Sequence, residues 1–387
     1  MIPVEEAAAR LLALARLLPA ESVPLSQAAG RWMAEPALAR RDQPPFDTSA
    51  MDGYAVQGDP KPGDSFTVIG EAGAGHRYAG SLAAGQAVRI FTGAPVPAGA
   101  TRVVIQEDVR RDGDRITLTS TDSGANIRLR GQDFPAGAAL APRRLRPADL
   151  ALLAAMNLPR VSVARRPVVA LIATGDELVM PGEDPGPDQI IASNAFALQA
   201  MARAEGAEAR LMPIAPDRPE ALREALSRAA DADVIVTIGG ASVGDHDLVG
   251  RVTQEMGLAP AFWKIAMRPG KPLMAGRLGD AILLGLPGNP VSAIVTGHLF
   301  LLPLLRALQG DPAPLPQPLT ATLAADLPAN GPRTHYMRAR RTGQDITPFD
   351  KQDSALLTIL TEANALLIRP ISAPPAQAGE SVPYLPL

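Results

Sequence analysis

The segment TIGGASVGDHDLV, residues 237–249, follows the apolar run DADVIV and combines two glycines, a serine and two closely spaced carboxylates. Adjacent glycines allow a backbone to approach a ligand closely and to point its N–H groups at an anion. Carboxylates at the same place would repel that anion unless a cation lay between them. The segment therefore raises a choice between a phosphate site, a metal site, both together, or a simple turn.

Further acidic side chains follow other apolar strands of the same region. Glu177 lies in ATGDELV, Asp217 follows RLMPIAP, and Asp245 and Asp247 lie in the segment above. Because the carboxyl ends of parallel strands meet at one edge of a sheet, we expect these four carboxylates to surround one crevice. Two like charges about 4 Å apart repel by roughly 4 kcal/mol at an effective dielectric constant of about 20, which a divalent cation or nearby lysines would offset. A solvated rim of acids is the alternative.

Basic side chains gather in the segment WKIAMRPGKPLMAG, which contains Lys264, Arg268 and Lys271. Three cations around a Pro-Gly turn suit a phosphate better than a helix face does, although a solvated basic loop is the alternative. Cations, acids and glycine loops at one edge indicate a Mg²⁺-dependent site for a phosphoanhydride or a phosphate ester. Asn194 and Asn289 stand at expected helix starts, where they also fit the role of caps.

The composition narrows the classes of function. The 387 residues predict two to four domains, and a net charge of -3 with 47% apolar residues gives no global basic field for nucleic acid or an anionic membrane. The absence of cysteine excludes disulfides, thiolate metal sites and a cysteine nucleophile, and the four scattered histidines disfavour a zinc site. The acidic N-terminus does not resemble a secretory signal, and the apolar run AIVTGHLFLLPLLRAL is short for a membrane span. We expect a cytoplasmic protein.

The periodicity of the chain predicts a multidomain α/β plus β fold. A helical pattern runs from Met1 to about Arg40, short strands divided by glycine and proline follow, and residues 167–309 alternate continuous apolar strands with helices, which predicts a mostly parallel sheet. The expected domains are a helical N-terminal segment with an elongated linker domain at 1–45 and 140–166, an inserted β domain at 46–139, an α/β domain at 167–312 and a C-terminal β domain at 313–387.

Seven segments in order resemble the MoeA family of molybdopterin molybdenumtransferases, to which the E domain of gephyrin also belongs. They are PPFDTSAMDGYAV, IFTGAPVPAGATRVVIQED, GQDF, ATGDELV, TIGGASVGDHDLV, WKIAMRPGKP and GLPGNPVSA, and the match covers nearly the whole chain. Any one of them alone would be weak, because related pterin-binding and CinA-like proteins share such loops. The resemblance implies a MogA-like central α/β domain, a small C-terminal β-barrel, and an enzyme that inserts molybdate into adenylated molybdopterin and releases AMP with help from Mg²⁺.

The resemblance also implies roles for individual residues. Those carried over as catalytic are Asp52, Thr92, Glu177, Asp217, Asp247, Lys264 and Arg268. Those carried over as binding the pterin, its phosphate or molybdate are Asn194, Gly239, Gly240, Ser242, Lys271, Asn289 and Ser354. The implied Mg²⁺ ligands are Glu177, Asp245 and Asp247. Two departures from the family pattern stand out: Arg268 replaces a frequent lysine, and KQDSALLTIL, which contains Ser354, is poorer in serine and glycine.

The resemblance implies partners as well. Family members are homodimers in which the inserted unit of one subunit faces the α/β crevice of the other, so Asp52 and Thr92 would reach the site from the partner. Transient contact with a molybdopterin adenylyltransferase and with cofactor acceptors is expected, and contact with nucleic acid or a membrane is not.

Two other functions fit parts of the sequence. The chain could adenylate molybdopterin, as MogA-type proteins do, but those resemble only the α/β region, and ATP consumption without molybdate would favour this alternative. It could also be a scaffold like gephyrin, although it has no fused second pterin-binding domain and no long disordered linker. Binding of receptor peptides without AMP release would favour the scaffold.

Overall fold

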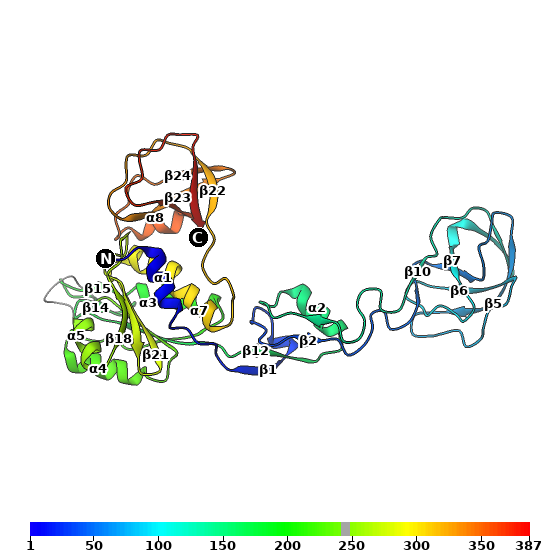
Figure 1. Cartoon of the computed structure of the whole chain (residues 1–387), viewed down its shortest axis with the longest axis horizontal. Helices are drawn as coiled ribbons and strands as arrows, with labels where there is room; N and C mark the ends of the chain where they lie inside the picture. Colours follow the sequence, from blue (N-terminus) through cyan, green and yellow to red (C-terminus); the bar gives the residue numbers. More distant parts are fainter. Residues whose placement is uncertain (241–247) are drawn as a thin grey trace. The chain divides into compact units, whose positions relative to one another are not determined.

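The computed structural model describes residues 1–240 and 248–387, which form two compact units (Figure 1). Unit 1 comprises Met1–Glu21 and Ala164–Leu387, and unit 2 comprises Ser22–Val163. Each unit contains its own clusters of buried apolar residues. Unit 2 is therefore an insertion, in sequence, near the N-terminus of unit 1.

Unit 1 contains a six-stranded sheet with the order β16 (Glu208–Leu211), β13 (Val168–Ala173), β17 (Val234–Ile238), β21 (Ala281–Leu286), β20 (Met274–Leu278) and β18 (Ala259–Trp263). The first four strands are parallel to one another. The last two continue the sheet as an antiparallel edge. The mostly parallel sheet predicted from the apolar strands is thus confirmed. A short parallel pair, β14 (Leu178–Val179) and β15 (Ile190–Ile191), lies beyond the end of β13.

Helices cover both faces of this sheet. One face carries α1 (Val4–Leu12), α3 (Asn194–Ala204), α6 (Pro290–Thr296) and α7 (Leu302–Leu308), and the other carries α4 (Pro219–Arg228) and α5 (Leu248–Glu255). Alternate residues of β13 serve the two faces, because successive side chains of a strand point in opposite directions: Val169 and Leu171 join one core, Ala170 and Ile172 the other. This two-sided burial explains why the strands are continuously apolar in sequence.

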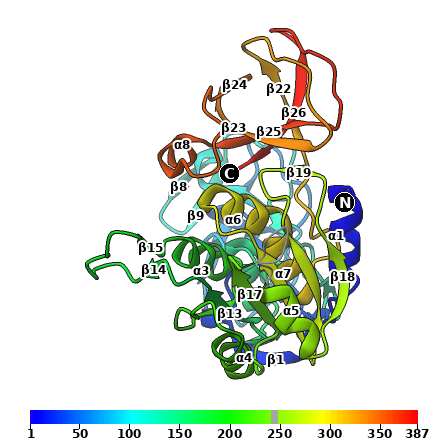
Figure 2. The same cartoon turned by 90° about the vertical axis from the view of Figure 1, so that its left-hand side faces the viewer.

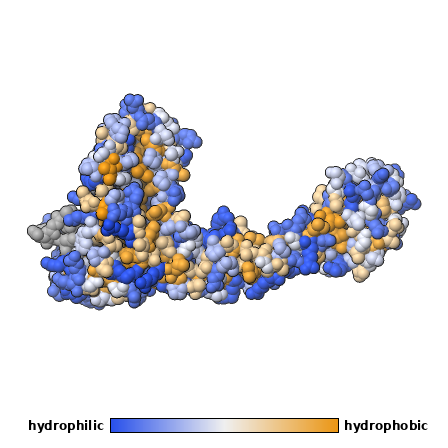
Figure 3. Space-filling model, in the orientation of Figure 1, coloured by the Kyte–Doolittle hydropathy of each residue, from blue (hydrophilic) through white to orange (hydrophobic). Residues whose placement is uncertain are grey.

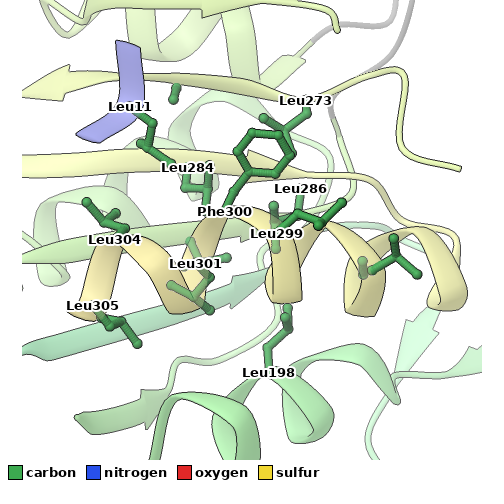
Figure 4. Packing of buried hydrophobic residues seen from close by; sticks show 14 of the residues in the cluster. Leu11, Leu198, Leu273, Leu284, Leu286, Leu299, Phe300, Leu301, Leu304 and Leu305 are labelled. Atoms are coloured by element: carbon green, nitrogen blue, oxygen red, sulfur yellow. The ribbon is translucent and has the colours of Figure 1, made fainter. Parts of the chain in front are cut away.

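The apolar run of residues 290–308 forms part of the first core. A π-helical segment, Gly297–Leu301, joins α6 to α7, and its Phe300 packs among leucines of the sheet and of neighbouring helices (Figure 4). Pro290–Leu308 is the one helix in the described ranges that is long and apolar enough to cross a membrane, but 78% of its apolar stretch is buried inside the fold. It therefore has the burial of a core helix.

The N-terminal helical pattern is shorter in the structure than we predicted. Helix α1 ends at Leu12, and the expected continuation to Arg40 is instead irregular chain followed by β1 (Ala20–Pro24) and a 3₁₀ turn (Leu25–Gln27). Prolines at 19 and 24 cannot supply helical N–H donors and disfavour helix in the preceding residue. Leu14 and Leu18 still pack against the core, so their spacing reflects burial without a helix. As a result residues 1–21 join unit 1, although we expected them in the linker domain.

The C-terminal part of unit 1 is a closed β-barrel. Its strands pair in the circular order β23 (Thr334–Thr342), β24 (Asp345–Pro348), β22 (Leu319–Leu323), β26 (Ser381–Pro386) and β25 (Ala365–Arg369), which pairs again with β23. The short strand β19 (Met267–Arg268) pairs with the first residues of β23. Helix α8 (Leu357–Glu362) of this barrel contacts α6 (Figure 2). The predicted small C-terminal barrel is confirmed.

Unit 2 contains a six-stranded sheet with the order β7 (Arg102–Ile105), β4 (Gly53–Val56), β6 (Gln86–Ile90), β5 (Ser65–Ala72), β9 (Arg115–Leu118) and β8 (Val109–Asp112). The chain around this sheet forms short elements: β2 (Ala37–Leu38), β3 (Thr48–Ser49), a 3₁₀ turn (Gln106–Asp108), β10 (Ile127–Arg128), β11 (Ala139–Leu140), α2 (Pro147–Ala155) and β12 (Arg160–Ala164). The small β unit predicted from glycine- and proline-divided strands is present. Hydrophilic residues cover much of the visible surface of both units, with hydrophobic residues interspersed (Figure 3).

Candidate functional site

Two adjoining cavities lie at the carboxyl ends of the parallel strands of unit 1. The larger cavity, of about 550 Å³, is lined by residues that follow β13, β17 and β21 and by the start of α3. The smaller cavity, of about 360 Å³, is lined by residues 268–272 and by residues of the C-terminal barrel domain. Pro272, Pro287 and Asn289 line both cavities. The barrel and the α/β domain together therefore form one continuous concave surface.

The structure brings together most of the site residues predicted for unit 1. In the larger cavity they are Glu177, Asn194, Asp217, Gly239, Gly240 and Asn289. In the smaller cavity they are Arg268, Lys271, Asn289 and Ser354. Ser242, Asp245 and Asp247 lie outside the described residues.

Among the predicted residues of unit 1 that the structure describes, Lys264 is the one that lines neither cavity. It follows the edge strand β18, with a φ of 63° and its backbone N–H donating to the Leu273 carbonyl. This edge strand is separated from β21 by β20. Because Lys264 follows the edge strand, it lies away from the cavities although it is only four residues before Arg268 in the sequence.

Gly239 and Gly240 directly follow β17 and line the larger cavity. Both have positive φ, 89° and 63°. A Cβ on Gly239 would lie 2.9 Å from the Thr174 carbonyl oxygen, and one on Gly240 would lie 2.7 Å from the Thr174 hydroxyl oxygen. Only glycine fits both the conformation and the space, so the bare backbone lines the cavity. The close neighbour in the structure is Thr174, and the approach to a ligand that the glycine pair indicated stays a prediction.

The carboxylates of the larger cavity repel one another. The pKa of Asp217 is raised, first by its partial burial and then by the negative charges of Asp176 and Glu177. A hydrogen bond from the Asp176 backbone opposes part of that rise, and the Asp176 carboxylate separately accepts a hydrogen bond from the Asp217 backbone N–H at 3.1 Å. Crowded oxygen ligands of this kind suit a hard cation. Among residues 1–240 and 248–387 there is no group of three acidic or histidine side chains placed to hold a metal ion.

The smaller cavity has the opposite charge. Arg268 and Lys271 line it as predicted, and Arg333 joins them from the chain just before β23. No sequence motif indicates Arg333, because the pairing between β19 and β23 is what brings it to Arg268. Nearby His335 is buried, and burial with the charges of Arg268, Arg338 and Arg333 lowers its pKa to about 4. His335 is therefore neutral at neutral pH, and the arginines and lysine supply the positive charge.

The asparagines connect the loops around the two cavities. Asn289 stands at the start of α6 as predicted, but its side chain donates to the Ser354 hydroxyl at 3.0 Å. Asn194 donates through its amide to the Gly288 carbonyl. Asn289 is the N-cap residue of α6 as predicted, and Ser193, not Asn194, is that of α3, but neither helix receives a side-chain cap hydrogen bond.

Asp52 and Thr92 form a separate polar cluster in unit 2. One Asp52 carboxylate oxygen accepts hydrogen bonds from the Thr92 backbone N–H at 2.7 Å and from its hydroxyl at 2.8 Å. The backbone hydrogen bond is the main cause that lowers the pKa of Asp52, which is therefore ionised at neutral pH. Arg89 lies over the rings of Tyr54 and Phe91 and donates to the Gly53 carbonyl at 3.1 Å. No motif in the sequence had indicated Arg89.

Three family models together match most of the chain. The model described as MoeA N-terminal region (domain I and II) matches residues 2–157, the probable molybdopterin binding domain matches residues 170–307, and the MoeA C-terminal region (domain IV) matches residues 320–387.

Individual relatives match over nearly their full length. A molybdopterin molybdenumtransferase of Nostoc sp. is 38% identical, over 95% of this chain and 88% of the relative. One of Bacillus subtilis is 33% identical, over 99% and 94%. A crystal structure of a molybdopterin biosynthesis MoeA protein from Pyrococcus horikoshii covers 100% of this chain and 99% of its own, with 30% identity and a TM-score of 0.85.

Proposed function

We propose, because this chain belongs to the MoeA family of molybdopterin molybdenumtransferases, that its two adjoining cavities bind the two substrates of molybdenum insertion. The larger cavity binds adenylated molybdopterin and the smaller one binds molybdate. One observation carries this proposal. A cavity lined by carboxylates and a cavity lined by cations have Asn289 and two prolines in common. Two substrates bound in these cavities would meet at the shared wall.

The larger cavity suits a phosphorylated pterin. Its volume of about 550 Å³ lies within the range of small-molecule sites, roughly 300 to 1,000 Å³. Gly239 and Gly240 line the cavity with bare backbone just after a buried strand, which lets a phosphate approach closely, while the Gly239 N–H itself donates to the Leu286 carbonyl at 3.0 Å. The Asn194 amide, fixed by its bond to Gly288, adds a polar group at the start of α3.

The smaller cavity suits molybdate, a tetrahedral dianion. Arg268, Lys271 and Arg333 supply positive charge, and the Ser354 hydroxyl adds a hydrogen-bonding group beside Asn289. Hydrogen bonds between cationic donors and anionic oxygens are stronger than neutral ones, so three cations compensate the loss of hydration. The guanidinium of Arg268 binds oxyanions with two parallel donors, a geometry that lysine does not offer.

Glu177 and Asp217 of the larger cavity are oxygen donors of the kind that Mg²⁺ prefers. Glu177 and Asp217 would bind it together with Asp245 and Asp247, and the crowding that raises the pKa of Asp217 would be relieved by a cation. When bound, Mg²⁺ supplies charge neutralisation to the phosphoanhydride and to the departing AMP. Glu177 and Asp217 would hold that ion, while Lys271 and Arg268 retain molybdate.

We further propose a cytoplasmic homodimer. Asp52 and Thr92 reach the site from the partner subunit, where the ionised Asp52 faces the bound substrates. Support comes from the family resemblance and from the preorganised Asp52–Thr92 pair, whose hydrogen bonds fix the carboxylate before substrate arrives. Contacts with an adenylyltransferase and with cofactor acceptors would be transient.

The test is a reaction of the purified protein with adenylated molybdopterin, with molybdate and Mg²⁺ each supplied or withheld. We expect AMP release and active molybdenum cofactor only when both ions are present, because one anion site and one cation site must be filled. ATP consumption without molybdate would instead favour an adenylyltransferase. Tight binding without AMP release under any condition would contradict the proposal and leave a carrier or a scaffold.

A further inference from the structure

Arg338 is a charged side chain inside the C-terminal barrel domain. It lies on β23 and is 1% exposed. Its Nη1 donates to the Asp353 carbonyl at 2.8 Å and to the Leu356 carbonyl at 3.5 Å, and its Nε donates to the Gln352 side-chain oxygen at 3.3 Å. The same Gln352 oxygen accepts from the Arg338 backbone N–H at 3.0 Å. All these hydrogen bonds of Arg338 go to residues 352–356, here called the 352–356 segment.

The stability of the barrel gives no reason for an arginine at this position. Burying a guanidinium costs free energy that its hydrogen bonds only partly return, and apolar residues of similar size often stabilise a core better. The next arginines on the same strand, Arg340 and Arg341, are exposed to solvent. Arg338 differs from them because its charge is buried. The function of this buried charge must therefore be sought in the residues to which it donates hydrogen bonds.

The 352–356 segment contributes to both cavities. Ser354 lines the smaller cavity and Ala355 lines the larger one. The Ser354 carbonyl accepts the Val291 N–H at 3.0 Å, and the Ser354 hydroxyl accepts from Asn289 at 3.0 Å. Val291 is in the first turn of α6, where backbone N–H groups lack partners within the helix. The segment thus accepts a hydrogen bond from a backbone N–H at the start of α6, and it forms the wall where the cavities adjoin.

We infer that Arg338 is a positioning residue that holds the 352–356 segment against the start of α6 and thereby sets the geometry of the wall between the two cavities. It touches neither cavity itself. Its planar guanidinium donates to side-chain and backbone oxygens of the segment from fixed directions, which a single ammonium cannot reproduce. The consequence for substrate use rests on the proposed function, but the consequence for the segment does not.

Amide hydrogen exchange tests the structural half of this inference without any substrate. In Arg338→Gln we expect the exchange rates of the Val291 amide and of the segment's amides to rise by about tenfold or more, because hydrogen bonds to a charged group are lost. The control is Arg341→Gln, on the same strand but exposed over the Tyr384 ring, where these rates should not change. Arg338→Lys should fall between wild type and Arg338→Gln.

Enzyme kinetics test the functional half. Arg338→Gln should raise the KM for molybdate by about tenfold to a hundredfold, since a displacement near 1 Å at a site has effects of that order. A purely structural role would lower the melting temperature and raise exchange throughout β23 and β25 with KM unchanged, and that result would overturn the inference. Unchanged exchange at Val291 and the segment in folded Arg338→Gln would overturn it equally.

A second variant guards against loss of folding. Gln352→Ala removes the side-chain oxygen that accepts from Arg338. Gln352 is half-buried, so the cavity left by its side chain costs less stability. If Arg338→Gln does not fold, Gln352→Ala must show the same local rise in exchange for the inference to stand. If the wild-type protein lacks transferase activity, the proposed function fails, and hydrogen exchange alone still decides the role of Arg338.

Discussion

Glu177→Gln is expected to lower the rate of AMP release by about a hundredfold or more while the protein remains folded. The substitution keeps the size of the side chain and removes one of the negative charges beside Asp217. Because that charge crowding is what makes the larger cavity attractive to a cation, its loss weakens Mg²⁺ binding. Single-turnover AMP release over a range of Mg²⁺ concentrations is the measurement, and higher Mg²⁺ should recover part of the rate.

A matched control is available at the opposite end of the same sheet. Glu208 begins β16, far along the strand direction from the cavities, and pairs only on the surface with Arg210. Glu208→Gln removes the same charge and should leave AMP release within about twofold of wild type, because a single surface ion pair contributes little. Near-normal turnover in Glu177→Gln, at every Mg²⁺ concentration, would contradict the assignment of Glu177.

Mixed dimers of two inactive variants are expected to regain activity. Asp52→Asn removes the negative charge that Thr92 holds in unit 2, and Glu177→Gln disables the larger cavity in unit 1. If each site takes Asp52 from one subunit and Glu177 from the other, a mixed dimer retains one intact site. Random pairing makes about half of the dimers mixed, so co-expression should restore about a quarter of wild-type activity.

The separately purified variants should each remain nearly inactive, and mixing them without subunit exchange should restore nothing. The decisive control places both substitutions on one chain and co-expresses it with the Thr92→Ala variant. One site of that mixed dimer then lacks both Glu177 and Thr92, and the other lacks Asp52, so activity should not recover. Absence of recovery with the two single variants would show that Asp52 does not act across a dimer.

The fold of unit 1 could be predicted from the sequence because burial on both faces leaves a clear pattern. Continuous apolar strands such as VVALIA become β13, whose alternate residues enter different cores. The N-terminal helix could not be delimited in the same way. Leu14 and Leu18 keep helical spacing, but they are buried by packing of irregular chain before Pro19. The periodicity of apolar residues indicates which side chains are buried. It indicates a helix only where no proline prevents the helical backbone from continuing.

The site residues that follow parallel strands could be predicted from the sequence. Those that reach the site through pairing with the C-terminal barrel could not. Glu177, Asp217 and Gly239 each follow a parallel strand, so topology alone brings them to one edge. Arg333 and Arg338 lie next to or on β23, more than 60 residues after Arg268 in the chain, and only the pairing of β19 with β23 brings this strand to the cavity. Pairing between distant strands leaves no local pattern in the sequence.

The most direct test of the central claim is to locate molybdenum in the protein. Crystals grown with molybdate should be measured at the molybdenum absorption edge, where anomalous scattering identifies the metal without reference to any assumed site. The account predicts the strongest peak in the smaller cavity, among Arg268, Lys271, Arg333 and Ser354, and its loss in Lys271→Met crystals. A strong peak elsewhere with none in that cavity would contradict the account.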